Sequence, residues 1–221
     1  MTADPTGLRL YDYAASANCY KVRLLLAQLR QPYERVPIDI FAGDTLTDDF
    51  QAKNPARSTP VLQIGESTYL TESNAILFFL AEGTPFLPDD PLLHAEVVRW
   101  LIFEQTDVMM TMGGLRFRLN TGRIGPDDPD AIRRRAGGEE ALELLDRHLR
   151  DQAFLAGERY TIADIAVYGY AHVAPEAGFE LAHYPAVSAW LRAVEEQPLF
   201  MNDLAPYPEN ARPGAGRSIY D

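Results

Sequence analysis

The stretch TPVLQIGESTYLTESNAILFFL, residues 59–80, decides the fold of the N-terminal part of the chain. Two short apolar runs flank Gly65-Glu66, which predicts two strands joined by a tight turn. From Ser73 onward the apolar residues recur at helical spacing, so the hairpin leads directly into a helix. We therefore expect a strand, strand, helix unit that ends near Glu82.

Upstream of this unit, strand and helix patterns alternate. Residues 8–13 predict a strand, and Ser16 is placed to cap a helix whose apolar face begins at Cys19. Residues 32–40 predict a second strand, and residues 47–55 predict a short helix that a proline ends. The resulting order, β-α-β-α-β-β-α, predicts a small domain that mixes strands and helices.

Downstream, residues 83–90 have the proline and aspartate content of a linker. Beyond them the sequence shows helical patterns and no convincing strand. The clearest helix start is formed by Thr161 and Asp164, the two partners of a capping box. We predict the following division: a mixed α+β domain over residues 1–82, a linker over 83–90, an all-helical domain over 91–205 and a tail over 206–221.

The composition limits the kinds of partner. The 221 residues carry a formal net charge of −12, and 47% of them are hydrophobic, as in soluble globular proteins. Because nucleic acids bind clustered cations, this acidity argues against a nucleic-acid partner. A single cysteine cannot form an internal disulfide, no signal-peptide pattern opens the sequence, and no apolar stretch approaches about 18 residues. We expect a cytoplasmic protein with no membrane partner.

No metal site is expected. The spacing of the histidines does not match that of zinc ligands, so each is interpreted as a surface or packing residue. These are His94, His148, His172 and His183.

Several stretches together resemble the cytosolic glutathione S-transferase superfamily, over about residues 8 to 200. They are YDYAASANCYKVRLLLAQL (11–29), NPARSTPVL (54–62), LTESNAILFFL (70–80) and FLAGERYTIADIAVYGY (154–170). The Ser-x-Asn-Cys-x-Lys-Val pattern in the first is similar to that of bacterial serine-type members. The resemblance implies a thioredoxin-like N-terminal domain with a mixed four-stranded sheet, followed by an all-α helical bundle domain, in a homodimer.

The resemblance also implies a glutathione site in the N-terminal domain. A cis Thr59-Pro60 bond would expose the backbone of Thr59, which would pair with the cysteinyl part of this peptide. Ser73 would begin a helix whose free N–H groups bind the γ-glutamyl carboxylate, while Glu72 holds the ammonium group. Arg57 would meet the glycine carboxylate. The simpler alternatives are that Ser73 only caps its helix and that Arg57 only forms a surface ion pair.

Three residues are candidates for contact with the thiol of glutathione. Ser16 aligns with the catalytic serine of serine-type members, and Asn18 offers an amide donor that could assist or replace it. Cys19 shares the apolar helix face, so we expect it to be buried and inert, with a reactive thiol as the alternative. Lowering a thiol pKa of about 8.5 by about 2 units requires about 2.7 kcal/mol. A hydroxyl donor and a helix N-terminus together can supply that free energy.

The second substrate is expected to contact the helical domain. Flexible thioethers suit varied apolar electrophiles, although methionines at helical spacing are equally expected in a core. The candidate residues are Thr106, Met109, Met110, Arg116, which would meet an anionic group, and Phe117.

The resemblance implies a glutathione S-transferase that stabilises the glutathione thiolate for attack on an electrophilic small molecule, as in detoxification. The first alternative is a zeta-like glutathione-dependent isomerase or dehalogenase, and the second is a disulfide reductase. A different class of function, a non-catalytic glutathione-binding or interaction module, would preserve the same residues.

Overall fold

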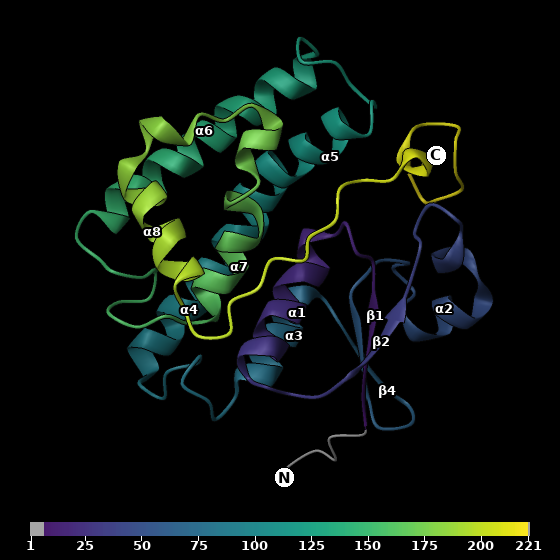
Figure 1. Ribbon diagram of the computed structural model, residues 1–221, viewed down its shortest axis with the longest axis horizontal. Coiled ribbons are helices and arrows are strands. Elements are labelled where there is room, and N and C mark those ends of the chain that lie inside the picture. The colour runs from purple at the N-terminus through teal and green to yellow at the C-terminus, as the bar shows by residue number, and fades with distance from the viewer. Residues whose placement is uncertain (1–6, 221) are drawn as a thin grey trace. The chain divides into compact units, whose positions relative to one another are not determined.

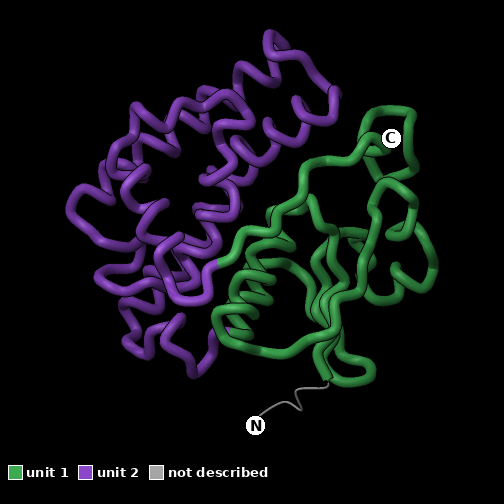
Figure 2. The backbone as a smooth tube through the Cα atoms, in the orientation of Figure 1, with its two compact units in different colours: residues 1–80, 201–221 green, residues 81–200 purple. Residues whose placement is uncertain are grey.

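The computed structural model describes residues 7–220 (Figure 1). Residues 1–6 and 221, the ends of the predicted first domain and tail, lie outside the described residues. The chain divides into two compact units, Met1–Leu80 with Met201–Asp221, and Ala81–Phe200 (Figure 2). The segment that begins at Met201 is thus grouped with the first unit, although it follows the helical unit in the sequence.

The first unit contains a mixed four-stranded sheet in the order β2-β1-β3-β4. Strand β1 (Leu8–Asp12) pairs in parallel with β2 (Glu34–Pro37) and antiparallel with β3 (Val61–Ile64). Strand β4 (Thr68–Thr71) pairs antiparallel with β3, as the hairpin pattern predicted. The predicted thioredoxin-like domain followed by a helical domain is confirmed.

Helices of the first unit follow the predicted order. Helix α1 (Ala17–Gln28) buries its apolar face, and α2 (Asp48–Lys53) begins at the cap Thr47. Asn54 ends α2 in an extended conformation, because the proline after it disfavours helical backbone. Helix α3 (Ser73–Ala81) starts directly after β4.

The second unit contains helices and one isolated β-bridge, Phe154–Gly157, and the helical stretch near its start is divided. It runs as α4 (Pro91–Phe103), a π-helical segment (Glu104–Gly113) and α5 (Gly114–Asn120). The remaining α-helices are α6 (Pro129–Leu149), α7 (Ile162–Ala171) and α8 (Pro185–Glu195).

Glycines allow the π-helical segment to pack closely within this unit. A Cβ atom at Gly113 would lie 2.5 Å from the Tyr170 ring, and one at Gly138 would lie 2.4 Å from the Phe179 ring. These distances are well inside van der Waals contact, so the close approach requires glycine at both positions. The unwinding was not predicted, because it depends on neighbours distant in the sequence.

The capping box at the start of α7 is confirmed. The Thr161 hydroxyl accepts from the backbone of Ala163 at 3.2 Å, and the Asp164 carboxylate accepts from the Thr161 N–H at 2.9 Å. Asp164 is fully buried and also accepts from the indole N–H of Trp190 at 2.9 Å. This carboxylate therefore connects the start of α7 with the middle of α8 in addition to capping a helix.

Two features of residues 7–220 bear on membrane and metal partners. Every helix in this part of the chain is too short or too polar to cross a membrane. Within the same residues, histidine, cysteine and carboxylate side chains do not gather in groups of three that could hold a metal ion.

Protonation of His172 is expected to lower the stability of the protein as the pH drops from about 6.5 to 4. Its ring stacks on Tyr168 at a centroid distance of 4.6 Å, and its Nδ1 lies 2.7 Å from the Tyr168 carbonyl. Burial lowers the pKa of His172 from 6.5 to about 4, so the unfolded chain takes up a proton before the folded chain does. The folded state therefore loses up to about 3 kcal/mol across this range.

Urea unfolding of the wild type and of His172→Gln at pH 7 and pH 4.5 would measure this contribution. We expect the free energy of unfolding to fall less from pH 7 to pH 4.5 in His172→Gln than in the wild type, whereas His183→Gln, at an exposed histidine, should behave as the wild type. An unchanged pH dependence in His172→Gln would contradict the assignment.

Candidate functional site

Ser16 is the N-cap of α1. Its Oγ accepts from the Cys19 N–H at 3.3 Å, and its own N–H donates to the Tyr13 carbonyl at 3.0 Å. The Ser16 side chain also hydrogen-bonds to the Cys19 side chain, and it is half-buried. The first turn of α1 contains no acidic residue, so the positive end of its dipole is not neutralised from within the helix. This end of α1 offers a hydroxyl donor and free N–H groups to a negatively charged ligand.

Asn18 connects α1 with α3. Its Oδ1 accepts from the Ser73 hydroxyl at 3.1 Å, although the two residues are 55 positions apart. Ser73 is 4% exposed and begins α3. Because the amide oxygen is engaged with Ser73, the NH₂ group of Asn18 is the part that can donate to a ligand. The predicted thiol and γ-glutamyl positions therefore lie beside each other.

Thr59 lies next to the same helix end. The Thr59-Pro60 bond is cis, as predicted, and the Thr59 side chain hydrogen-bonds to Cys19. Within residues 7–220, no hydrogen bond joins the Thr59 backbone to another residue. Its N–H and C=O groups are therefore available to an extended peptide.

The loop before Thr59 is fixed by Asn54, a positioning residue that the sequence reasoning missed. Asn54 is 3% exposed; its amide donates to the Ser58 carbonyl at 2.8 Å and its oxygen accepts from Ala56 at 3.0 Å. The Asn-Pro pair in the sequence suggested only the end of a helix. The local turn that asparagine side chains favour was the available signal.

Glu72 and Arg57 flank the cluster on exposed loop positions with positive φ. Glu72 has a φ of 67°, and its carbonyl accepts from Ile76 at 2.9 Å. A left-handed conformation is unusual for glutamate and is found where structure or function holds it in place. Arg57, with a φ of 56°, donates to the Gln51 side chain at 2.8 Å instead of to the acidic residues of α2.

Cys19 is fully buried, as its spacing predicted. Its sulfur accepts from the Tyr13 N–H at 3.4 Å. Burial raises the pKa of the Cys19 thiol to about 11, and the charge of Asp12 acts in the same direction. The thiol is therefore protonated at neutral pH and inaccessible to a substrate in the folded protein.

Cys19 is accordingly expected to resist alkylation in the folded protein. We predict that iodoacetamide at pH 8 modifies it at least about 100-fold more slowly in buffer than in denaturant, because reaction requires exposure and deprotonation of the thiol. Mass spectrometry after timed quenching would measure both rates. Comparable rates in the two conditions would show that Cys19 is reachable and would return it to the catalytic candidates.

The electrophile candidates lie in the helical unit. Thr106 and Met110 are exposed on the π-helical segment, and Met109 and Phe117 are half-buried. Arg116 is 2% exposed, and its Nε–H donates to Glu176 at 2.7 Å. Contact of these residues with a substrate stays a prediction. An anionic group of the substrate would have to compete with Glu176 for Arg116.

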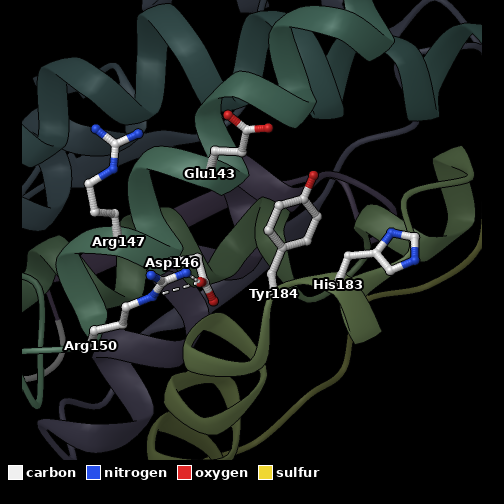
Figure 3. A pocket seen from close by; sticks show the side chains of 6 residues that line it. All are labelled: Glu143, Asp146, Arg147, Arg150, His183 and Tyr184. Carbon is white, nitrogen blue, oxygen red and sulfur yellow. Dashed lines mark hydrogen bonds and ion pairs between the residues drawn. The ribbon is translucent and has the colours of Figure 1, made fainter.

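A polar pocket in the helical unit contains none of the predicted residues (Figure 3). The Asp146 carboxylate joins Arg150 at 2.9 Å and accepts from the backbone of Ala186 at 2.8 Å. Asp146 thus caps α8 from a neighbouring helix, which gives these charges a structural role. The pocket, of about 520 Å³, is lined by Glu143, Asp146, Arg147, Arg150, His183 and Tyr184.

Comparisons with known proteins agree with this geometry. Residues 10–85 match the family model "Glutathione S-transferase, N-terminal domain", and residues 108–198 match "Glutathione S-transferase, C-terminal domain". A crystal structure of a glutathione S-transferase from Pseudomonas fluorescens is 40% identical and superimposes with a TM-score of 0.87, covering 90% of this chain and 100% of that one. The chain belongs to the glutathione S-transferase family.

Two other proteins to which this chain is similar carry further descriptions. A glutathione transferase family member from P. fluorescens, crystallised with two glutathione bound, is 26% identical with a TM-score of 0.80, covering 90% of this chain and 93% of that one. Disulfide-bond oxidoreductase YfcG of Escherichia coli is 29% identical over 84% of this chain and 89% of its own length.

A buried ionic cluster next to the candidate site was missed by the sequence reasoning. The Arg23 and Asp12 side chains are fully buried and joined at 2.5 Å. Arg23 also contacts Asp203, from the C-terminal segment, at 2.8 Å. No sequence pattern marks such a cluster, since its members come from three distant segments.

Proposed function

We propose that this chain is an active glutathione S-transferase that binds glutathione at the N-termini of α1 and α3 and transfers its sulfur to an electrophilic carbon. The observation that carries the proposal is the hydrogen bond between Asn18 and Ser73. It supports the proposal because it joins Asn18, the proposed thiol contact, to the start of α3, the proposed site of the γ-glutamyl carboxylate. The relative crystallised with glutathione supports this choice of ligand.

In the proposed mechanism, Ser16 and Asn18 donate hydrogen bonds to the glutathione sulfur. The thiol proton leaves to solvent because these donors and the α1 dipole favour the thiolate. The sulfur then forms a bond to the electrophilic carbon, and the leaving group departs with the electron pair of the broken bond. No general base on the protein is required.

The remaining predicted residues hold the substrates. Thr59, next to Pro60, would pair through its backbone with the cysteinyl part, and Ser73 would bind the γ-glutamyl carboxylate. Glu72 would hold the ammonium group. Arg57 would reach the glycine carboxylate by leaving Gln51. The electrophile would contact Thr106, Met109, Met110 and Phe117, with Arg116 serving an anionic group. We further propose that the protein acts as a homodimer in the cytoplasm.

The test is the ultraviolet difference absorbance of bound glutathione thiolate from pH 5 to 9, in the wild type and in Ser16→Ala. We expect a thiol pKa well below that of free glutathione in the wild type, and a rise of about 1 unit in the variant. Turnover of an activated aryl halide should follow the same pH profile. Binding with an unshifted thiol pKa and no turnover would instead favour a non-catalytic module.

A second candidate is glutathione-dependent disulfide reduction, favoured by the similarity to the E. coli disulfide-bond oxidoreductase. The only cysteine here is buried, so the reducing thiol would have to come from glutathione itself. Reduction of a small mixed disulfide by this protein, at a higher kcat/KM than aryl transfer, would select this function. Isomerase and dehalogenase substrates can be compared in the same way.

A further inference from the structure

The C-terminal segment 201–220 folds onto the first unit despite having almost no regular structure. Its only helical turn is the 3-10 turn Glu209–Ala211. Figure 1 shows this yellow segment passing the start of α1 and ending near α2, and it is grouped with the first unit. A terminal segment without regular structure is normally poorly ordered unless specific contacts hold it.

Contacts at the far end attach this segment to the loop after β2. Asn210 donates to the Asp39 carboxylate at 2.8 Å, and the Arg217 N–H donates to the Phe41 carbonyl at 2.7 Å. Gly216 packs so tightly there that a Cβ atom would lie 2.5 Å from the Phe41 carbonyl oxygen. The far end is therefore held by backbone and side-chain contacts together.

Contacts at the near end reach the ionic cluster. The Asp203 carboxylate accepts from Arg23 Nε at 2.8 Å and 3.0 Å. The Arg23 side chain is fully buried and also contacts Asp12, while Arg35 contacts both carboxylates. A buried guanidinium needs this surrounding negative charge, so Asp203 is required to balance the cluster.

The same contacts converge on the turn that carries Ser16. The Ala14 carbonyl accepts from Arg23 Nη2 at 3.3 Å and from the Ala205 N–H at 3.1 Å. Ala14 lies two residues before Ser16 in the short turn between β1 and α1. One donor to Ala14 belongs to the C-terminal segment, and the other is held by Asp203.

We propose that Asp203 is a positioning residue for the thiol site, and that the C-terminal segment fixes the β1–α1 turn so that the Ser16 hydroxyl faces the glutathione sulfur. The contact between Ser16 and the sulfur rests on the proposed function. The structural claim, that the C-terminal segment fixes the β1–α1 turn, is independent of that function. The two can therefore be tested separately.

The first experiment needs no ligand. Hydrogen exchange of peptides covering residues 13–20 would be compared in the wild type, Asp203→Ala and Ala205→Pro, the last of which removes the N–H that reaches Ala14 and keeps Asp203 in place. We expect exchange at least about tenfold faster in both variants. The hydrogen bonds of the Ser16 and Tyr20 amides should open more often when the turn is no longer held. Arg212→Ala, at an exposed position of the same segment, is the control.

The second experiment measures the thiol pKa of bound glutathione in the same variants. We expect the thiol pKa to rise by about 0.5 to 1 unit in Asp203→Ala. It should return to the wild-type value in Asp203→Glu and stay at that value in Arg212→Ala. If Asp203→Ala lowers thermal stability but leaves both turn exchange and thiol pKa unchanged, the residue is only structural and the proposal is overturned. If Asp203→Ala does not fold, Ala205→Pro decides by the same two measurements.

A wild-type protein that does not lower the thiol pKa would refute the proposed function. The exchange measurement would then still decide whether the segment fixes the turn. Faster exchange in Asp203→Ala and Ala205→Pro would support that structural claim, and unchanged exchange would overturn it.

Discussion

Asp164→Ala is expected to reduce the free energy of unfolding by about 3 to 5 kcal/mol, the largest stability change predicted for a single side chain. The carboxylate is fully buried and accepts hydrogen bonds from Leu155, Thr161 and Trp190 at 2.9 Å each. Alanine would leave these donors buried without an acceptor, and each such donor costs about 1 to 3 kcal/mol. Urea unfolding at pH 7 would measure the difference.

Asp90→Ala is the matched control. Asp90 caps α4 at an exposed position, where its carboxylate accepts from Leu92 and Leu93 at 3.0 Å. Because water can satisfy those donors when the cap is removed, we expect a loss of only about 1 kcal/mol. Asp164→Asn retains one acceptor oxygen, so its loss of unfolding free energy should lie between those of Asp90→Ala and Asp164→Ala. Equal losses for Asp90→Ala and Asp164→Ala would mean that Asp164 is no more than a helix cap.

Local features of the fold were predictable because they depend on neighbours in the sequence. The capping box of Thr161 and Asp164 could be predicted from spacing alone, as could the burial of Cys19 on the apolar face of α1. The third partner of Asp164, Trp190, could not, since it lies 26 residues away on another helix. The same limit applies to the π-helical segment, whose close contact with Tyr170 depends on the tertiary fold.

In the candidate site, too, local features were predictable from the sequence and contacts between distant residues were not. Ser16, Thr59 and Ser73 were identified from motifs, because helix caps and a cis proline turn have local sequence patterns. Their grouping into one site was implied by the family resemblance and not by local spacing, and the link from Asn18 to Ser73 spans 55 residues. The contribution of Asp203 was also hidden, because a segment without periodicity gives no indication of where it packs.

The double variant Ser16→Ala/Asn18→Ala is expected to raise the thiol pKa of bound glutathione by about 2 units, close to that of a free thiol. Each residue offers one donor: the hydroxyl proton of Ser16 and the amide of Asn18 whose oxygen is held by Ser73. A hydrogen bond to a charged group contributes about 1.5 to 3 kcal/mol, so the single variants should each account for about half of the shift. At pH 6 the rate of aryl transfer should fall on the order of 100-fold in the double variant.

The comparison of single and double variants also decides how the donors share the thiolate. If the two single shifts in the thiol pKa add up to the shift in the double variant, both groups contact the sulfur. If the double variant has the same thiol pKa as Ser16→Ala, Asn18 is only a structural link to Ser73. Thr47→Ala controls for the lost helix cap at Ser16, because it removes the equivalent cap of α2, a helix that supplies neither of the proposed donors to the sulfur. It should lower stability by about 1 kcal/mol without moving the thiol pKa. A thiol pKa that is equally low in the wild type and the double variant would remove both residues from the mechanism and leave the dipole of α1 as the source of activation.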